Sequence, residues 1–261
     1  MERKADVAVI GGGIVGCAAA YYLAKQGLRP VLFEKGRIAG EQSSRNWGFV
    51  RQQGRDPAEV PLMMASNRIW RGLEEELGAD LEWTQGGNLV VAETQEKLGL
   101  FEQWLEVAKT HQLDSRLLTR VEIERLVPGI KTDALGALYT PSDGHAEPAK
   151  VAPAIARAAE RLGAAIHTDC AVLAIETKGG AVSGVVTEKG IFGADAVICA
   201  SGAWTSRLLS RLGVSLPQLW MRGTVARTTA APREVTKMGV WAGLAFRQRR
   251  DGTFNIAAGG S

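Results

Sequence analysis

The first third of the chain switches from a strand-like to a helix-like pattern of apolar positions and back again. Apolar runs at residues 6–10 and 31–33 predict two strands, and residues 17–23 between them predict a helix. A polar stretch rich in Gly, Ser, Arg and Gln follows at residues 35–55 and predicts a loop. Strand, helix and strand in this order are typical of the start of a parallel α/β sheet.

The middle of the chain, roughly residues 50–144, breaks this alternation. Apolar residues at helical spacing predict helices at 57–77, 96–111 and 120–126. Short apolar runs predict strands at 81–83, 86–91 and 137–139. We therefore expect this block to be inserted into the first domain as a separate α+β layer.

The alternation resumes at His145, with Pro148 placed near the first turn of a predicted helix at 149–162. Strands are then expected at 165–167, 171–175, 182–187 and 196–199, a helix at 205–212, and further strands at 244–250 and 253–257. The predicted fold class is α/β: a doubly wound, Rossmann-like domain with a mainly parallel sheet, interrupted by a mixed-sheet α+β domain. The expected boundaries are 1–50 and 145–215 for the first domain, and 51–144 and 216–261 for the second.

The turn after the first predicted strand carries the motif G-x-G-x-x-G at Gly11, Gly13 and Gly16. The first glycine permits a tight turn, the second lets backbone N–H groups approach a pyrophosphate, and the third lets helix and strand pack closely. The helix N-terminus attracts the anion. Glu34 ends the second strand 18 residues after Gly16, where an acidic side chain accepts hydrogen bonds from a ribose. Strand, glycines, helix, second strand and acid together predict a dinucleotide site.

Composition and charge argue against nucleic acid and membranes as binding partners. The 261 residues are 46% hydrophobic and 23% charged with a net charge of +3, as in an ordinary soluble protein. No long basic run points to nucleic acid or an anionic membrane, and no apolar run is long enough for a transmembrane segment. The three cysteines have neither metal nor disulfide spacing, and the N-terminus lacks a secretory signal. These features predict a cytoplasmic protein with reduced thiols.

Four separated segments share their order and spacing with a known family. They are residues 11–35, the loop at 43–48, residues 145–148 with the strand 172–175, and residues 200–204. Over nearly its whole length the chain resembles the D-amino-acid oxidase superfamily of FAD-dependent oxidoreductases, and within it the glycine oxidase and sarcosine oxidase branch.

The resemblance implies FAD as the cofactor and makes the first domain an FAD-binding domain. By this resemblance the pyrophosphate is held by Gly11, Gly13, Ile14, Val15 and Gly16, and the adenosine ribose by Glu34. The remaining implied cofactor contacts are Lys35, Ser43, Ser44, Arg45, Asn46, Trp47, Gly48, Val172, Ala200, Ser201 and Gly202. Serine hydroxyls and an arginine fork in the 43–48 loop also suit phosphate oxygens on chemical grounds. No metal is expected.

The resemblance further implies an enzyme that oxidises the C–N bond of a small amine or amino acid. The substrate gives a hydride to flavin N5 and the resulting imine is hydrolysed, so the protein supplies orientation rather than a general base. No catalytic residue is therefore assigned. Arg51, just after the 43–48 loop, and Arg247, on the predicted strand 244–250, are the candidates for holding a substrate carboxylate. The implied electron acceptor is oxygen or a quinone.

Other functions fit the same sequence. The family pattern continues beyond a strand such as 253–257, so we expect a partner chain or a missing C-terminal segment to complete the substrate domain. Without it, the chain is expected to be a catalytically silent FAD-binding fragment or subunit. A 2-hydroxy-acid dehydrogenase uses the same fold. A more distant alternative is an NAD-dependent dehydrogenase, since Glu34 suits the NAD ribose equally well.

Overall fold

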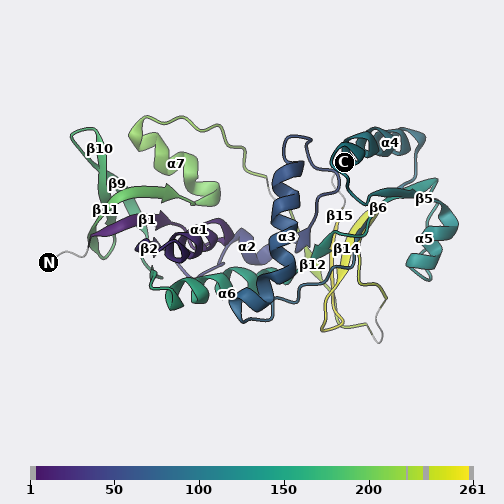
Figure 1. Cartoon of the computed structure of the whole chain (residues 1–261), viewed down its shortest axis with the longest axis horizontal. Helices are drawn as coiled ribbons and strands as arrows, with labels where there is room; N and C mark the ends of the chain where they lie inside the picture. Colours follow the sequence, from purple (N-terminus) through teal and green to yellow (C-terminus); the bar gives the residue numbers. More distant parts are fainter. Residues whose placement is uncertain (1–3, 222, 232–234, 259–261) are drawn as a thin grey trace. The chain divides into compact units, whose positions relative to one another are not determined.

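The computed structural model describes residues 4–221, 223–231 and 235–258. The chain forms two compact units, and each is described by itself (Figure 1). Unit 1 comprises Met1–Asn46 and Pro148–Arg222, and unit 2 comprises Trp47–Glu147 and Gly223–Ser261. These units are defined by contacts within the structure. The boundaries expected from the sequence concern the FAD-binding and substrate domains, and they stay predictions.

Unit 1 is built on a six-stranded sheet with the strand order β8-β2-β1-β11-β10-β9. Its strands are β1 (Ala5–Ile10), β2 (Pro30–Phe33), β8 (Ala165–His167), β9 (Val172–Lys178), β10 (Ala181–Thr187) and β11 (Gly190–Cys199). The strands β8, β2, β1 and β11 run parallel, whereas β9 and β10 form an antiparallel hairpin beside them. The predicted α/β class is confirmed, and the carboxyl ends of β1, β2 and β11 meet at the edge where the glycine turn lies.

Strand β11 is longer than the sequence pattern predicts because its two halves have different neighbours. Ala194–Cys199 continue the parallel sheet beside β1, in register with Ala5 to Ile10. Residues 190–193 pair with the antiparallel strand β10. The expected strand 196–199 covers only the parallel half, because the apolar pattern is weak over Gly190 to Ala194.

Helices of unit 1 cover this sheet: α1 (Ile14–Lys25), α2 (Gln42–Arg45), α6 (Pro148–Arg161) and α7 (Thr205–Leu209), with 3-10 turns η1 (Gly202–Trp204) and η2 (Ser210–Leu212). Helix α1 packs against α6, whose Val151, Ile155 and Ala159 are buried. The helix predicted over 205–212 divides into α7 and η2, and ends at Gly213 in the left-handed conformation with φ of 74°.

Unit 2 contains a mixed seven-stranded sheet with the order β12-β15-β14-β13-β4-β6-β5. Its strands are β4 (Asn88–Ala92), β5 (Arg116–Leu118), β6 (Gly136–Thr140), β12 (Ala226–Arg227), β13 (Gly239–Ala242), β14 (Leu244–Gln248) and β15 (Phe254–Ala258). Among the described strands of this sheet, the β4–β13 pair is parallel and the other pairs are antiparallel. Two further short strands, β3 (Phe49–Val50) and β7 (Gly144–His145), pair with each other.

The helices of unit 2 match the sequence pattern. They are α3 (Val60–Leu77), α4 (Gln95–Thr110) and α5 (Arg120–Leu126). Thr119 and Glu122 form a capping box at the start of α5. Across the part of the chain that the structure describes, no helix combines the length and the apolar character needed to cross a bilayer.

The strand predicted at residues 81–83 is wrong. The backbone N–H groups of Leu81 and Trp83 both donate to Glu74 Oε1 at the end of α3, at 2.8 and 3.1 Å. Glu82 between them has φ of 55°, a left-handed conformation that no strand contains. A side-chain acceptor therefore replaces the sheet partner that the apolar pattern implied.

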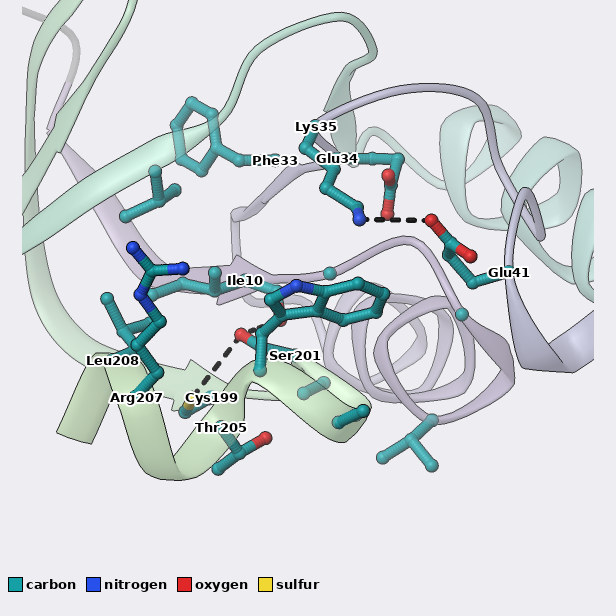
Figure 2. Close-up of a pocket in the computed structure, with 18 of the residues that line it drawn as sticks. Ile10, Phe33, Glu34, Lys35, Glu41, Cys199, Ser201, Thr205, Arg207 and Leu208 are labelled. Carbon is teal, nitrogen blue, oxygen red and sulfur yellow. Dashed lines mark hydrogen bonds and ion pairs between the residues drawn. The ribbon is translucent and has the colours of Figure 1, made fainter. Parts of the chain in front are cut away.

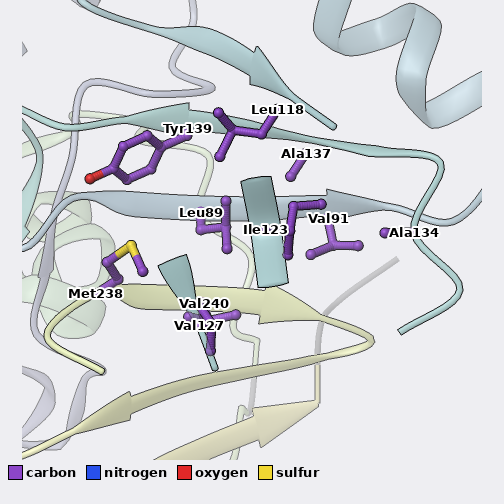
Figure 3. Close-up of a cluster of buried hydrophobic side chains, with 10 residues drawn as sticks. All are labelled: Leu89, Val91, Leu118, Ile123, Val127, Ala134, Ala137, Tyr139, Met238 and Val240. Atoms are coloured by element: carbon purple, nitrogen blue, oxygen red, sulfur yellow. The ribbon is translucent and has the colours of Figure 1, made fainter. Parts of the chain in front are cut away.

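The core of unit 2 lies between its sheet and helix α5 (Figure 3). Leu89 and Val91 of β4, Val240 of β13 and Ile123 of α5 are completely buried. Burying a side chain of this size contributes about 1.5–3 kcal/mol. This packing fixes the sheet that carries Trp241 and Arg247.

Candidate cofactor site

The glycine turn after β1 approaches the end of β11 too closely for any side chain. A Cβ on Gly11, which has φ of 110°, would lie 2.4 Å from the carbonyl oxygen of Ala200. A Cβ on Gly16 would lie 1.9 Å from the carbonyl oxygen of Gly11, so helix α1 packs directly on the turn. Two of the three motif glycines are thus required by backbone contacts that the structure shows.

The N-terminus of helix α1 opens toward this turn. Its N-cap is Gly13, which has no side chain to cap the helix, and its first turn has no acidic residue. Ile14 N donates to Ser43 Oγ at 2.9 Å. The positive end of the helix dipole is therefore not neutralised by a carboxylate of its own first turn, which suits an anion such as a phosphate.

Glu34 organises the other side of the turn. Its Oε2 accepts from Gly12 N at 2.7 Å, and its Oε1 accepts from Gly36 N at 2.8 Å. The side chain is buried with 9% of the residue exposed. A carboxylate offers about four acceptor positions, so the two backbone bonds orient Glu34 and leave capacity for the hydroxyls of a ribose.

These groups line a cavity of about 750 Å³ that lies wholly within unit 1. Ile10, Phe33, Arg207 and Leu208 are among the residues that line it (Figure 2). Val172 and Leu173 at the start of β9 extend the apolar wall. Ligand cavities typically measure about 300–1,000 Å³ and combine apolar walls with a few polar groups, and this one has both.

The rim of the cavity carries a short series of charged and aromatic contacts. Lys35 Nζ lies 3.0 Å from Glu41 Oε1, an ion pair drawn in Figure 2. The same ammonium lies 3.4 Å from the centre of the Trp204 ring, within cation–π distance. Trp204 therefore lines the cavity beside the predicted Lys35.

Two cysteine thiols, those of Cys17 and Cys199, border the turn. Burial, together with the nearby charge of Glu34, raises the pKa of Cys17 to about 12. Its Sγ lies 3.4 Å from the carbonyl oxygen of Gly12. Cys199 Sγ lies 3.4 Å from Ser201 Oγ. The Cys17 thiol stays protonated and serves as a small packing group.

Most of the residues predicted to contact the cofactor come together at this cavity. Those that line it are Gly11, Gly13, Ile14, Val15, Glu34, Lys35, Ser43, Val172, Ala200, Ser201 and Gly202. Gly16 lies behind them, in the contact between α1 and the turn. Their individual roles toward FAD stay predictions.

The rest of the predicted 43–48 loop does not line this cavity. Ser44 Oγ donates to the carbonyl oxygen of Glu41, and Arg45 donates to the carbonyl oxygen of Gly40 at 2.7 Å. Asn46 Nδ2 donates back to the carbonyl oxygens of Gln42 and Ser43. These three side chains fix the shape of the loop. Trp47 and Gly48 belong to unit 2.

The two candidate carboxylate anchors also belong to unit 2, and they differ in how far their charge is already compensated. Arg51 Nη1 donates to the carbonyl oxygen of Gln53 at 2.9 Å, and its guanidinium lies 5.8 Å from the Trp241 ring centre. Arg247 is only 1% exposed, donates from Nε to the carbonyl oxygen of Trp47, and pairs with Glu147 at 3.3 Å. Arg51 is thus the more available of the two.

Sequence reasoning missed several residues of the cavity wall: Phe33, Glu41, Leu208, Arg211, Leu216 and Gln218. The last four lie beyond the 200–204 segment, in a stretch with no recognisable motif.

The chemistry of the cavity fits a dinucleotide. The glycine backbone and the helix N-terminus suit phosphate, the buried acid suits ribose, and the apolar walls suit adenine. Among the described residues, no cluster of His, Cys, Asp or Glu could hold a metal ion.

Comparison with known proteins supports this interpretation. The chain is 34% identical over 232 residues to glycine oxidase from Bacillus subtilis (strain 168), covering 85% of this chain and 61% of that protein. It is 33% identical over 229 residues to mitochondrial sarcosine dehydrogenase from Mus musculus, covering 85% of this chain and 25% of that protein. The chain thus spans between a quarter and about three fifths of the length of these relatives.

A solved structure, that of L-amino acid deaminase from Proteus myxofaciens in complex with anthranilate, is similar with a TM-score of 0.90 and 31% identity. The match covers 98% of this chain and 59% of that one. Residues 6–261 match the family described as FAD dependent oxidoreductase (DAO). The predicted family and its cofactor FAD are confirmed. The relatives named above are an amino-acid oxidase and an amine dehydrogenase, as the sequence predicted for the family. With this match over nearly its whole length, the chain belongs to the family of FAD-dependent oxidoreductases.

Proposed function

We propose that this chain is the FAD-binding part, with much of the substrate domain, of an enzyme that oxidises the C–N bond of a small amine or amino acid. The observation that carries the proposal is the cavity in unit 1, where Glu34, the glycine turn and the α1 N-terminus lie together. Glycine oxidase and sarcosine dehydrogenase, which act on such substrates by name, support the substrate class.

The chain's residues have binding and orienting roles in this proposal. The glycine turn and Ser43 hold the diphosphate, Glu34 holds the ribose, and Val172 borders the adenine. When bound, FAD would supply the hydride acceptor for oxidation of the substrate's C–N bond, with an imine that hydrolyses in water as the proposed product and oxygen or a quinone as the proposed electron acceptor. We propose a cytoplasmic location, which rests on the sequence alone.

Arg51 is the residue that we propose for the substrate carboxylate. Burial and the neighbouring charge of Arg55 lower the pKa of Arg51, but an arginine stays charged in proteins at neutral pH. Its hydrogen bond to the carbonyl oxygen of Gln53 uses Nη1, and the guanidinium has further N–H groups for a carboxylate. Arg247, already paired with Glu147, is the second candidate.

An absorption spectrum with substrate addition tests the proposal directly. The purified protein is expected to be yellow from bound flavin, and anaerobic addition of glycine, sarcosine or a D-amino acid is expected to bleach it. Bleaching by 2-hydroxy acids alone would replace the amine substrate with a hydroxy acid. A protein that binds FAD but is bleached by none of them would instead be the catalytically silent fragment or subunit.

Replacing Arg51 by glutamine is expected to raise KM for a carboxylate substrate by about 10- to 100-fold, the value of one charge-assisted hydrogen bond or pair. FAD affinity should not change. Steady-state kinetics with Arg51→Gln, Arg51→Lys and the exposed control Arg68→Gln on helix α3 measures this. Arg51→Lys should recover part of the loss. An unchanged KM in Arg51→Gln would move the assignment to Arg247.

A further inference from the structure

The segment after η2, residues 214–221, has no regular secondary structure and contributes to the wall of the cofactor cavity. Two of its side chains, Leu216 and Gln218, line the cavity. The side chains of Leu219 and Met221 face solvent, with exposed fractions of 95% and 89%. The segment therefore contacts the rest of unit 1 through a few defined side chains.

Gln218 makes two hydrogen bonds to the turn that ends β11. Its Oε1 accepts from Ser206 N at 2.8 Å, and its Nε2 donates to the carbonyl oxygen of Gly202 at 3.2 Å. Ser206 lies in the first turn of α7, where backbone N–H groups have no partner within the helix. A side chain from the segment thus supplies the cap that this short helix lacks.

A second contact joins the segment to the same stretch of chain, residues 202–206. Trp220 packs edge-on against Trp204, with ring centres 5.7 Å apart and an interplanar angle of 74°. Trp204 in turn lies under Lys35, which pairs with Glu41. The contacts run from the loop after β2, through Trp204, to the segment after η2.

We propose that residues 214–221 form a strap that retains the dinucleotide, with Gln218 as its latch. The strap rests on FAD occupying this cavity, as proposed above. Because Leu216 and Gln218 of the strap lie in the cavity wall, we expect the strap to open when FAD enters and when it leaves, so that its two hydrogen bonds and the Trp204–Trp220 contact oppose both steps. Gln218 is a positioning residue that acts on cofactor exchange rather than on the reaction.

The test is the kinetics of FAD exchange, followed by flavin fluorescence with the whole chain. Gln218→Ala is expected to raise both the association and the dissociation rate constant by about 10-fold, since losing a hydrogen-bond pair of this kind changes a rate by about one order of magnitude. The equilibrium Kd should change less than either rate. Trp220→Ala, which removes the second contact, should act in the same direction.

Leu219→Ala is the matched control, because this neighbouring side chain is almost fully exposed and should leave both rates unchanged. A rise in the dissociation rate alone would make Gln218 an ordinary lining contact and overturn the latch, as would unchanged rates. If Gln218→Ala does not fold, as judged by circular dichroism, Trp220→Ala decides in its place. A wild-type protein that takes up no FAD would instead overturn the proposed function.

Discussion

Replacing Gly16 by alanine is expected to destabilise unit 1 by at least about 3 kcal/mol and to abolish FAD binding. The added Cβ would lie 1.9 Å from the carbonyl oxygen of Gly11, and this neighbour is backbone rather than a flexible side chain. Helix α1 must therefore move away from the turn. The same displacement would remove the α1 N-terminus from the place where the diphosphate is expected.

Thermal unfolding and FAD titration of Gly16→Ala measure the two effects. Gly72→Ala is the matched control, because Gly72 lies in helix α3 with no atom within 4 Å of the added Cβ. That substitution should stabilise the protein by about 0.5–1 kcal/mol through helix propensity. A Gly16→Ala protein that melts like the wild type and binds FAD normally would contradict the close packing of α1 on the turn.

The residues of the site that are close in sequence could be predicted from the sequence, and those that come from an irregular segment could not. Gly11, Gly16 and Glu34 were predicted correctly as neighbours because their spacing follows from one strand, one turn and one helix. Gln218 could not be predicted, since its role depends on where an irregular segment returns to the sheet. The irregular backbone at 81–83 could not be predicted either, because it depends on the side chain of Glu74, which accepts hydrogen bonds from the backbone N–H groups of Leu81 and Trp83.

The second unit was predicted less completely for a related reason. Strands β3, β5, β7, β12 and β13 were not expected from the sequence, and all five are two to four residues long. Short strands carry too few alternating positions to give a pattern. They exist because long-range partners supply hydrogen bonds, as β7 does for β3.

Two titratable groups next to each other in unit 2 are expected to make its stability depend on pH in opposite directions. Asp143 accepts from the N–H groups of Gln52 and Gln53, yet burial, and to a lesser extent Asp114, raises its pKa to about 6. Burial lowers the pKa of His145 to about 4, and the positive charges of Arg247 and Arg250 act in the same direction.

The hydrogen bonds of His145 explain its shift. Its Nε2 lies 3.0 Å from the carbonyl oxygen of Lys237 and must carry the proton. Its Nδ1 is buried and has no hydrogen-bond partner among the described residues. Protonating Nδ1 would therefore bury an unsatisfied donor as well as a charge.

The direction of each pH effect on stability follows from the shift in pKa between the folded and unfolded states. Asp143 has a folded pKa above its unfolded value, so its contribution to the free energy of unfolding is fully present below about pH 4 and is lost as pH rises through about 6. His145 has a folded pKa below its unfolded value of 6.5, so its contribution is present above about pH 6.5 and is lost as pH falls through about 4. Each shift corresponds to at most about 3 kcal/mol, and the two nearly cancel in the wild type.

Substituting one of the two groups should make the pH dependence caused by the other measurable. In His145→Gln, where the amide replaces the Nε2 donor, the free energy of unfolding should increase as pH falls from about 6 to about 4. In Asp143→Asn it should decrease over the same range. Urea unfolding followed by tryptophan fluorescence measures both, and it reports chiefly on unit 2 because only Trp204 and Trp220 of the seven tryptophans lie in unit 1. Equal pH slopes in the two variants and the wild type would show that neither buried group titrates as its surroundings require.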